Sequence, residues 1–268
     1  MIVSSAHRPA LGGYREHPLI LAVLIVAVFL ATAAPIALGV TVDAAYAIGS
    51  KIILCGLAVV LLTGLRWWRR AGFLALPGRR DLAWLAPPAL LVLAALVAVV
   101  VAGPVPMEPA LVLAFAIAAL GTGFSEEALF RGVLLESLRP RGAKWAITGT
   151  TLAFAAIHLA GLMGGATLEA TLAQVLLGGI PFGLAFAGLR LATRSIWPLV
   201  VIHAVNNFTS YLTSGHWEAV SQDMTRFALV GVIQLGLLIV LLGYGVWFLW
   251  RFSRDVRCKK GHGRQATP

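Results

Sequence analysis

Long apolar runs separated by short polar segments are the dominant pattern along this chain. The apolar runs cover residues 18–40, 52–65, 82–103, 109–124, 145–157, 170–189, 195–215 and 227–250. A membrane-spanning α-helix needs about 20 mostly apolar residues, and each run holds most or all of that length. The 52–65 run is long enough only if its helix begins near Ala44, which places Lys51 within the helix or snorkelling toward its end. The pattern therefore predicts eight transmembrane helices.

Composition places the chain in the same class. Of its 268 residues, 59% are hydrophobic and only 12% are charged, whereas a soluble domain carries about 25% charged residues. No Ser-rich or Pro-rich linker and no repeat of fixed period divides the sequence. We therefore expect one all-α domain, a polytopic membrane helix bundle.

The expected organisation has a core and a periphery. It comprises an N-terminal tail (1–17), three peripheral helices (18–103), a core of four helices (109–212), a last helix (226–252) and a basic tail (253–268). Between the second and third helices, segment 66–81 combines five arginines with three aromatic residues. It is expected either to lie as an amphipathic piece at the membrane interface or to form an ordinary basic loop with an aromatic belt.

The distribution of basic residues fixes the expected orientation. Under the eight-helix topology, all of the 21 lysines and arginines except Lys51, Arg131 and Arg226 fall on one side of the membrane. The positive-inside rule makes that side, with both termini, cytoplasmic. The net charge of +10 is therefore expected to face the anionic lipid head groups of a cell membrane rather than nucleic acid.

A few polar residues interrupt the apolar core. They are Glu126, Glu127, Arg131, His158, His203, Asn206 and Asn207. An ionisable side chain at the centre of a bilayer costs about 2.5–3.5 kcal/mol or more, so such residues are paired, line a cavity or carry out chemistry. Glu126, His158 and Asn207 each lie 13 or 14 residues from a cytoplasmic basic residue, which at about 1.5 Å per residue places them near one depth. His203 is expected one helical turn nearer the cytoplasm.

Spacing separates the two adjacent glutamates. Glu127 and Arg131 are four residues apart with the acid first, the favourable order for an ion pair on a helix. Glu126, about 100° further round an α-helix with 3.6 residues per turn, has no local partner and is therefore the better candidate for a general base.

On the seventh expected helix, His203 and Asn207 are also four residues apart and share a face. Their N–H groups can stabilise a developing oxyanion. Asn206 points elsewhere and is expected to form a hydrogen bond between helices.

Three motifs in this core resemble those of a known family. They are "EEALFR" (126–131), which looks like EExxxR, "FAAIH" (154–158), which looks like FxxxH, and "HAVNN" (203–207), which looks like HxxxN. These are the motifs of the CPBP family of intramembrane proteases, which includes the type II CAAX prenyl endopeptidases and the bacterial Abi proteins. The resemblance covers roughly residues 109–212. It implies hydrolysis of a peptide bond in a membrane-associated peptide or protein substrate.

The resemblance also implies roles for the motif residues. Glu126 would activate the attacking water, and His158 would position that water or shuttle its proton. His203 and Asn207 would stabilise the tetrahedral oxyanion, while Glu127 and Arg131 would hold the site together.

Several alternatives remain open at this stage. A site without metal is favoured because the sequence has no HExxH and no local pair of chelating residues, but Glu126, His158 and His203 can also be grouped as zinc ligands. A proton- or ion-coupled transporter also places ionisable residues within the membrane, although no inverted repeat is found. A catalytically inactive scaffold or immunity protein is the third alternative. The substrate is open among a prenylated or other hydrophobic C-terminus, a bacteriocin-like peptide and a sorting tail, and the sequence specifies no oligomeric state.

Overall fold

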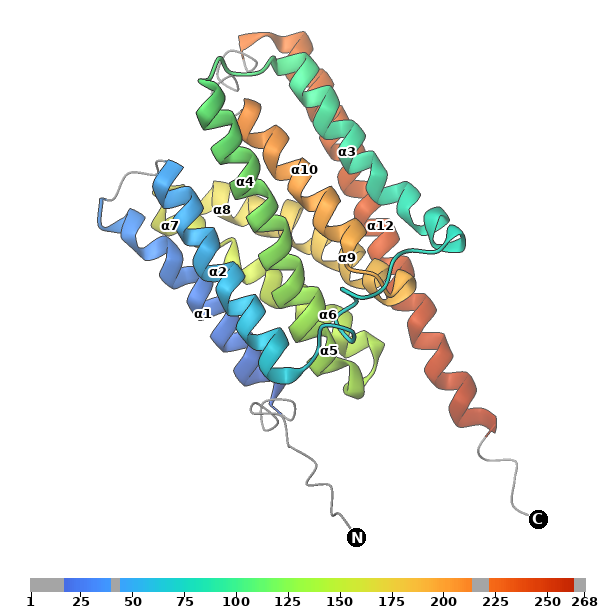
Figure 1. Cartoon of the computed structure of the whole chain (residues 1–268). Coiled ribbons are helices and arrows are strands. Elements are labelled where there is room, and N and C mark those ends of the chain that lie inside the picture. Colours follow the sequence, from blue (N-terminus) through green and yellow to red (C-terminus); the bar gives the residue numbers. More distant parts are fainter. Residues whose placement is uncertain (1–16, 40–43, 214–221, 263–268) are drawn as a thin grey trace, which may run out of the picture.

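The computed structural model describes residues 17–39, 44–213 and 222–262, and all regular structure in these residues is helical (Figure 1). Most of the expected N-terminal tail, and residues 263–268 of the expected basic tail, lie outside the described residues. The predicted all-α membrane bundle is confirmed. The α-helices are α1 (Pro18–Ala37), α2 (Ala44–Leu65), α3 (Leu82–Ala102), α4 (Pro109–Glu126), α5 (Leu135–Leu138), α6 (Ala143–Ile157), α7 (Ala160–Met163), α8 (Leu168–Ala173), α9 (Ile180–Thr193), α10 (Trp197–Thr213) and α12 (Met224–His262).

Two π-helical stretches join shorter helices into long ones. Glu127–Leu134 connects α4 to α5, and Gln174–Gly179 connects α8 to α9. Within the described residues, seven helices are long and apolar enough to cross a membrane. The helix α10, with 17 residues, completes the expected set of eight. The protein is therefore a multi-pass membrane protein.

Some helix boundaries differ from those expected. The run predicted at 109–124 continues as one helical segment, Pro109–Arg141, through the charged motif. The last helix was expected to end at residue 252, but α12 continues to His262. Lysine and arginine are good helix formers and are favourable near a helix C-terminus, so the first part of the basic tail extends the helix. By contrast, α2 does begin at Ala44.

Segment 66–81 forms no α-helix of its own. It folds as a series of turns that ends in a short 3₁₀ helix, Arg79–Asp81. Trp67 and Phe73 are buried, and the indole N–H of Trp197 donates to the Phe73 carbonyl at 2.9 Å. The segment is therefore a loop docked against the bundle rather than a free interfacial helix.

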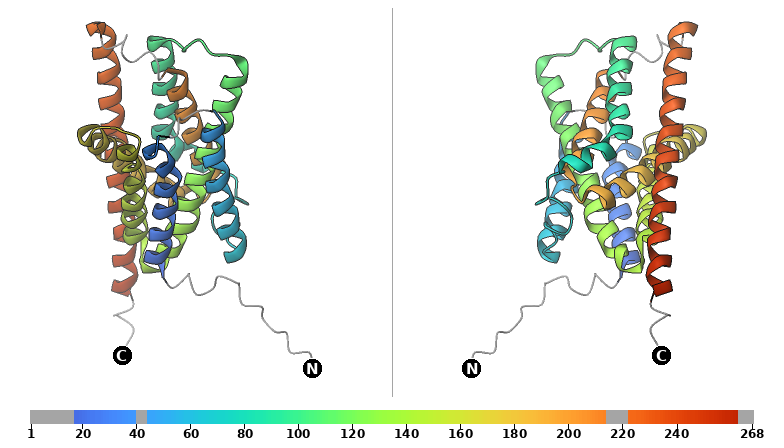
Figure 2. Two further views of the ribbon diagram at one scale, coloured as in Figure 1. Left: turned by 90° about the vertical axis from the view of Figure 1, so that its left-hand side faces the viewer. Right: turned by 90° about the vertical axis from the view of Figure 1, so that its right-hand side faces the viewer.

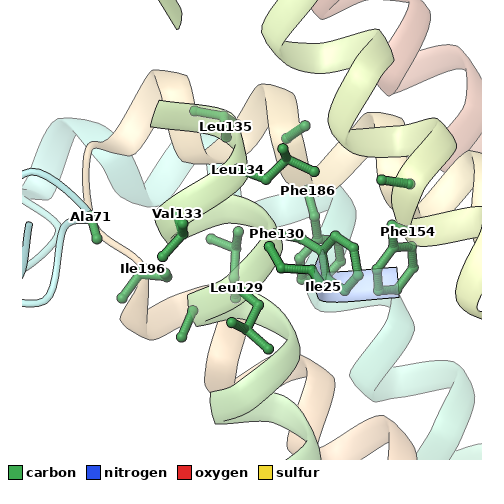
Figure 3. Close-up of a cluster of buried hydrophobic side chains, with 14 of the residues drawn as sticks. Ile25, Ala71, Leu129, Phe130, Val133, Leu134, Leu135, Phe154, Phe186 and Ile196 are labelled. Carbon is green, nitrogen blue, oxygen red and sulfur yellow. The ribbon is translucent and has the colours of Figure 1, made fainter. Parts of the chain in front are cut away.

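The hydrophobic core surrounds the π-helical stretch that follows α4. Phe130 lies between Phe29 of α1 and Phe154 of α6, with ring centroids 5.5 Å and 5.3 Å away. Figure 3 shows Phe130, Phe154 and Phe186 gathered beside Ile25 of α1. Aromatic packing thus fixes the π-helical stretch against α1, α6 and α9.

The two described ends of the chain lie at the same end of the bundle. In Figure 2 the beginning of α1 and the end of α12 are both at the lower end, and α12 runs the full height of one side. Two ends on the same side of a membrane require an even number of crossings. This agrees with the expectation that both termini lie on one side.

Packing between α9 and α12 depends on two glycines. A Cβ atom added at Gly188 would lie 2.2 Å from the Phe248 ring, and one added at Gly245 would lie 2.4 Å from the Leu184 side chain. Small residues allow this close approach of membrane helices.

We therefore predict that Gly188→Ala lowers the free energy of unfolding by about 1–3 kcal/mol through overpacking. Gly236→Ala is the matched control, because an added Cβ there meets nothing within 4 Å. Thermal unfolding of both variants in detergent tests this. Equal melting temperatures for the two variants would contradict the packing described.

Candidate active site

Glu126 and Glu127 lie where α4 passes into the π-helical stretch Glu127–Leu134. All eight residues of that stretch are buried. A π-helix closes i→i+5 hydrogen bonds, is rare, and occurs mostly as single turns at functional sites. Nothing in the apolar and polar pattern of "EEALFRG" distinguishes it from an α-helix, so this change cannot be predicted from the pattern.

The glutamate and arginine at positions 127 and 131 form a buried ion pair. Nη1 of Arg131 donates to Oε1 of Glu127 at 3.0 Å, and neither side chain is exposed. Oε2 of Glu127, and Nε and Nη2 of Arg131, have no hydrogen-bond partner among the described residues. The two charges are therefore paired with each other through one hydrogen bond in a fully buried setting.

Aromatic rings surround the arginine. Its guanidinium carbon lies 4.1 Å from the ring centroid of Phe154, 5.7 Å from that of Phe186 and 5.9 Å from that of Phe182. A cation over an aromatic face is attracted by the ring quadrupole, more strongly where water is excluded. This aromatic cage, formed by Phe154, Phe182 and Phe186, compensates Arg131 for part of its lost hydration.

His203 of α10 links the two glutamates. Its Nδ1 lies 2.8 Å from Oε1 of Glu127, and its Nε2 lies 3.6 Å from Oε2 of Glu126. A carboxylate only accepts, so Nδ1–H donates to Glu127, and this fixes which edge of the ring faces Glu126. Arg131, Glu127, His203 and Glu126 thus form one continuous row, which we call the charge row.

The position of His203 differs from the sequence-based expectation, which placed Asn207 at the level of Glu126. The estimate assumed α-helical rise throughout, and a π-helix advances less along its axis per residue because each turn holds more residues. Close packing contributes as well. A Cβ atom added at Gly123 would lie 2.6 Å from the Val200 carbonyl oxygen, so α4 and α10 meet backbone to backbone one turn before Glu126.

Exposure separates the two ends of the charge row. The side chain of Glu126 is 11% exposed and that of His203 is 7% exposed, while those of Glu127 and Arg131 are fully buried. Glu126 is therefore the end of the row that a water molecule can reach.

Asn207 lies at the edge of this arrangement. Its Nδ2 donates to the backbone carbonyl of His203 at 3.1 Å. An amide nitrogen carries two N–H groups, so one remains for a ligand. Asn206 points elsewhere, into a cavity of about 200 Å³ that Phe182, Gln234 and Thr209 also line.

His158 follows the last residue of α6 and is partly exposed. Its Nδ1 lies 3.0 Å from the Phe154 carbonyl oxygen. The Phe154 ring stands 5.1 Å from the His158 ring and 6.2 Å from the His203 ring. Among the described residues, His158 forms no hydrogen bond or ion pair with either glutamate, so the structure brings Glu126, Glu127, Arg131 and His203 together and leaves His158 nearby.

The second π-helical stretch ends against His158. A Cβ atom added at Gly179 would lie 3.0 Å from Cα of Ala155 and 3.4 Å from Nδ1 of His158. A side chain at this position would require its neighbours to shift by a few tenths of an ångström. Both π-helical stretches therefore adjoin candidate residues.

The residues do not fit a metal centre in this arrangement. Over residues 17–39, 44–213 and 222–262, no three His, Cys, Asp or Glu side chains are placed to hold a metal ion. In the candidate set Glu126, His158 and His203, the one contact among the described residues is that between Glu126 and His203, at 3.6 Å. No step of the chemistry is therefore derived through a metal.

Sequence reasoning missed one further residue near the site. Tyr211 of α10 lies beside the Thr122 side chain, one turn before Glu126, and within electrostatic range of Glu126. Its ring stacks on Phe115 with centroids 5.1 Å apart. The spacing of 203, 207 and 211, four residues each, is the signal that was available, since it places all three on one face of α10.

The core that contains these residues matches a known protein family. Residues 108–209 match the family model described as type II CAAX prenyl endopeptidase Rce1-like. This core is therefore similar to that of the type II CAAX prenyl endopeptidases. The matched segment begins one residue before α4 and ends within α10, so it contains all six candidate residues. The resemblance of the motifs to CPBP proteases is thereby confirmed. No curated protein and no solved structure matches the chain. The chain is thus a multi-pass membrane protein whose core, residues 108–209, is similar to type II CAAX prenyl endopeptidases.

Proposed function

We propose that this protein is an intramembrane endopeptidase in which Glu126 is the general base for an attacking water. The observation that carries the proposal is the charge row, in which Glu127 and Arg131 are fully buried and Glu126, at the other end, has the most exposed side chain at 11%. A general base needs a lone pair directed at a reachable proton, and Glu126 supplies it.

In the proposed reaction, a water molecule bridges Oε2 of Glu126 and Nε2 of His203. These two atoms are 3.6 Å apart. Glu126 takes a proton from this water as its oxygen attacks the peptide carbonyl carbon. The proton passes to Nε2 of His203, which then donates a hydrogen bond to the oxyanion. On collapse of the tetrahedral intermediate the C–N bond breaks, and the same proton moves through Glu126 to the leaving amine.

The remaining candidates complete this scheme. Glu127 accepts from Nδ1–H of His203 and stabilises the imidazolium that forms, as a buried carboxylate does in other triads. Arg131 is the counter-charge of Glu127, at 3.0 Å. The free N–H of Asn207 is the second oxyanion donor, and His158 positions the water or shuttles a proton from the partly exposed side.

The substrate class follows from the family description and the setting. We propose a membrane-associated peptide or protein with a hydrophobic C-terminus, including a prenylated one, cleaved within or next to the bilayer. We also propose a cell-membrane location with both termini cytoplasmic. This orientation is supported by the positive-inside rule and by the position of α1 and α12 ends in Figure 2.

The test uses purified protein in liposomes, a prenylated peptide with a CAAX-type C-terminus and the same peptide without its lipid. We expect a new peptide terminus by mass spectrometry that forms at the same rate after treatment with a strong zinc chelator. Loss of cleavage on chelation, restored by zinc alone, would contradict the metal-free mechanism. Proton uptake that depends on Glu126, without any cleavage, would replace the protease assignment with a transporter.

A further inference from the structure

A cleft lined by six arginines lies away from the charge row. It has a volume of about 1000 Å³ and lies between the segment after α2, the end of α5 and the end of α9. Its arginines are Arg66, Arg69, Arg70, Arg139, Arg190 and Arg194. We call it the arginine cleft. None of its arginines takes part in the proposed peptide hydrolysis.

The positive charge in the arginine cleft is largely uncompensated. Glu136 is the one carboxylate within 4 Å of these arginines in the described part of the chain. It contacts Arg139 at 3.1 Å, Arg70 at 3.4 Å and Arg190 at 3.6 Å. Arg66, Arg69 and Arg194 form no ion pair within the same residues. One acid therefore faces six guanidinium groups, and the cleft is an anion-attracting site.

One wall of the arginine cleft is held in place by buried contacts rather than formed by mobile surface side chains. The Arg190 side chain is 3% exposed and donates to the carbonyls of Arg70 at 2.7 Å and Ala71 at 3.1 Å. Gly72 lies against it with φ +87°, and a Cβ atom there would lie 2.5 Å from the Arg194 carbonyl oxygen and 2.9 Å from Cζ of Arg190. The segment that forms one wall is thus locked to α9.

Backbone strain points to the same place. Arg66 and Arg194, with φ of +58° and +59°, are the two non-glycine residues with positive φ in the described chain. They follow the ends of α2 and α9, where glycine is the usual residue because a Cβ atom is unfavourable in this conformation. Both strained residues are arginines that line the same cleft. Backbone strain of this kind clusters at functional sites, so it is a reason to look for a function here.

The neighbours of the cleft indicate which anion reaches it. Leu74 lines the cleft with 74% of its surface exposed, and Leu76 close by is 80% exposed. Trp197, on the first turn of α10, adds an aromatic residue of the kind enriched at membrane interfaces. Exposed apolar side chains beside clustered arginines suit a ligand with acyl chains and an anionic head group, because guanidinium forks match phosphate oxygens two at a time.

We propose that the arginine cleft binds the phosphate group of an anionic membrane phospholipid. The site holds the head group between Arg66 and Arg194, with the buried Arg190 as its fixed wall, and the acyl chains run past Leu74 into the bilayer. Binding there ties the docked segment after α2 to the C-terminal end of α9.

The test compares lipid binding in three proteins purified in a neutral detergent. They are the wild type, the double variant Arg66→Gly/Arg194→Gly, and Arg79→Gln, a control that removes an exposed charge from the same segment but outside the cleft. Glycine relieves the strained conformation, so the double variant is expected to fold. Native mass spectrometry with added phosphatidylglycerol or phosphatidylcholine gives the number of lipids bound, and thermal unfolding gives the stabilisation.

We expect the wild type and Arg79→Gln to bind phosphatidylglycerol in preference to phosphatidylcholine and to be stabilised by it. The double variant is expected to bind it at least about tenfold more weakly, because charge-assisted hydrogen bonds are lost. Equal binding by the double variant, or an equal loss in Arg79→Gln, would overturn the proposal. Stabilisation by inorganic phosphate alone, equal to that by the lipid, would overturn the lipid as the source of the phosphate group.

Discussion

Replacing Glu126 with glutamine is expected to lower the rate of peptide hydrolysis about 10³-fold, the typical contribution of a general base, while the protein remains folded. Glutamine has the shape of glutamate but cannot take a proton from water. Glu126 is the partly exposed member of the charge row, and its nearest partner, Nε2 of His203, stands at 3.6 Å, so little packing or pairing is lost. Single-turnover cleavage in liposomes, with thermal unfolding measured on the same preparation, checks both parts.

The adjacent position supplies the matched control. Glu127→Gln removes the buried partner of Arg131 at 3.0 Å and of His203 at 2.8 Å. We expect it to lower the melting temperature clearly, whereas Glu126→Gln leaves it nearly unchanged, so thermal unfolding distinguishes the two positions. A folded Glu126→Gln protein that retains activity within about tenfold of the wild type, less than a general base contributes, would argue against Glu126 as the base.

Replacing Arg131 with methionine is expected to be the most destabilising single change in the core, by about 3–5 kcal/mol. It leaves the Glu127 carboxylate buried without a counter-charge, whereas methionine itself fits among the rings of Phe154, Phe182 and Phe186. Reversible unfolding of the purified protein in mixed micelles gives the free-energy change.

The double variant Glu127→Gln/Arg131→Met separates pairing from packing. Removing both charges of a buried pair is often close to neutral, so we expect the double variant to recover much of the stability that Arg131→Met loses. The coupling energy of the double-mutant cycle then reports the buried pair. Strictly additive effects would show that the two residues do not stabilise each other.

The helix bundle and part of the candidate site could be predicted from the sequence, for identifiable physical reasons. Apolar run length specifies membrane helices almost independently of their packing, which is why even the start of α2 at Ala44 was predicted. Side chains four residues apart on a helix are neighbours, and the Glu127–Arg131 pair forms as that spacing predicts. Local rules also distinguished Glu126 from Glu127, although the two are adjacent.

What depends on contacts between helices was not predictable. The π-helical stretch after Glu126 is stabilised by packing of Phe130 against α1 and α6, and it changes the level at which α4 meets α10. The depth count therefore paired Glu126 with Asn207, whereas His203 contacts both glutamates. Phe182 and Phe186 of the aromatic cage carry no signal in one sequence, because an aromatic residue in a membrane helix has many ordinary uses.

The docked segment 66–81 shows the same limit. Its arginines and aromatic residues are typical of any cytoplasmic loop. The contact of Gly72 with Arg190 and Arg194 joins positions more than a hundred residues apart. Only the folded chain brings these arginines into one cleft.

The central claim, that this protein hydrolyses peptide bonds with Glu126 as its base, is tested most directly by its cleavage products. Wild type and Glu126→Gln, reconstituted side by side in liposomes, are given a library of membrane peptides, and new termini are identified by mass spectrometry. We predict defined new termini from the wild type and none above background from Glu126→Gln. The same termini from both proteins at similar rates, or none from a folded wild type, would contradict the account.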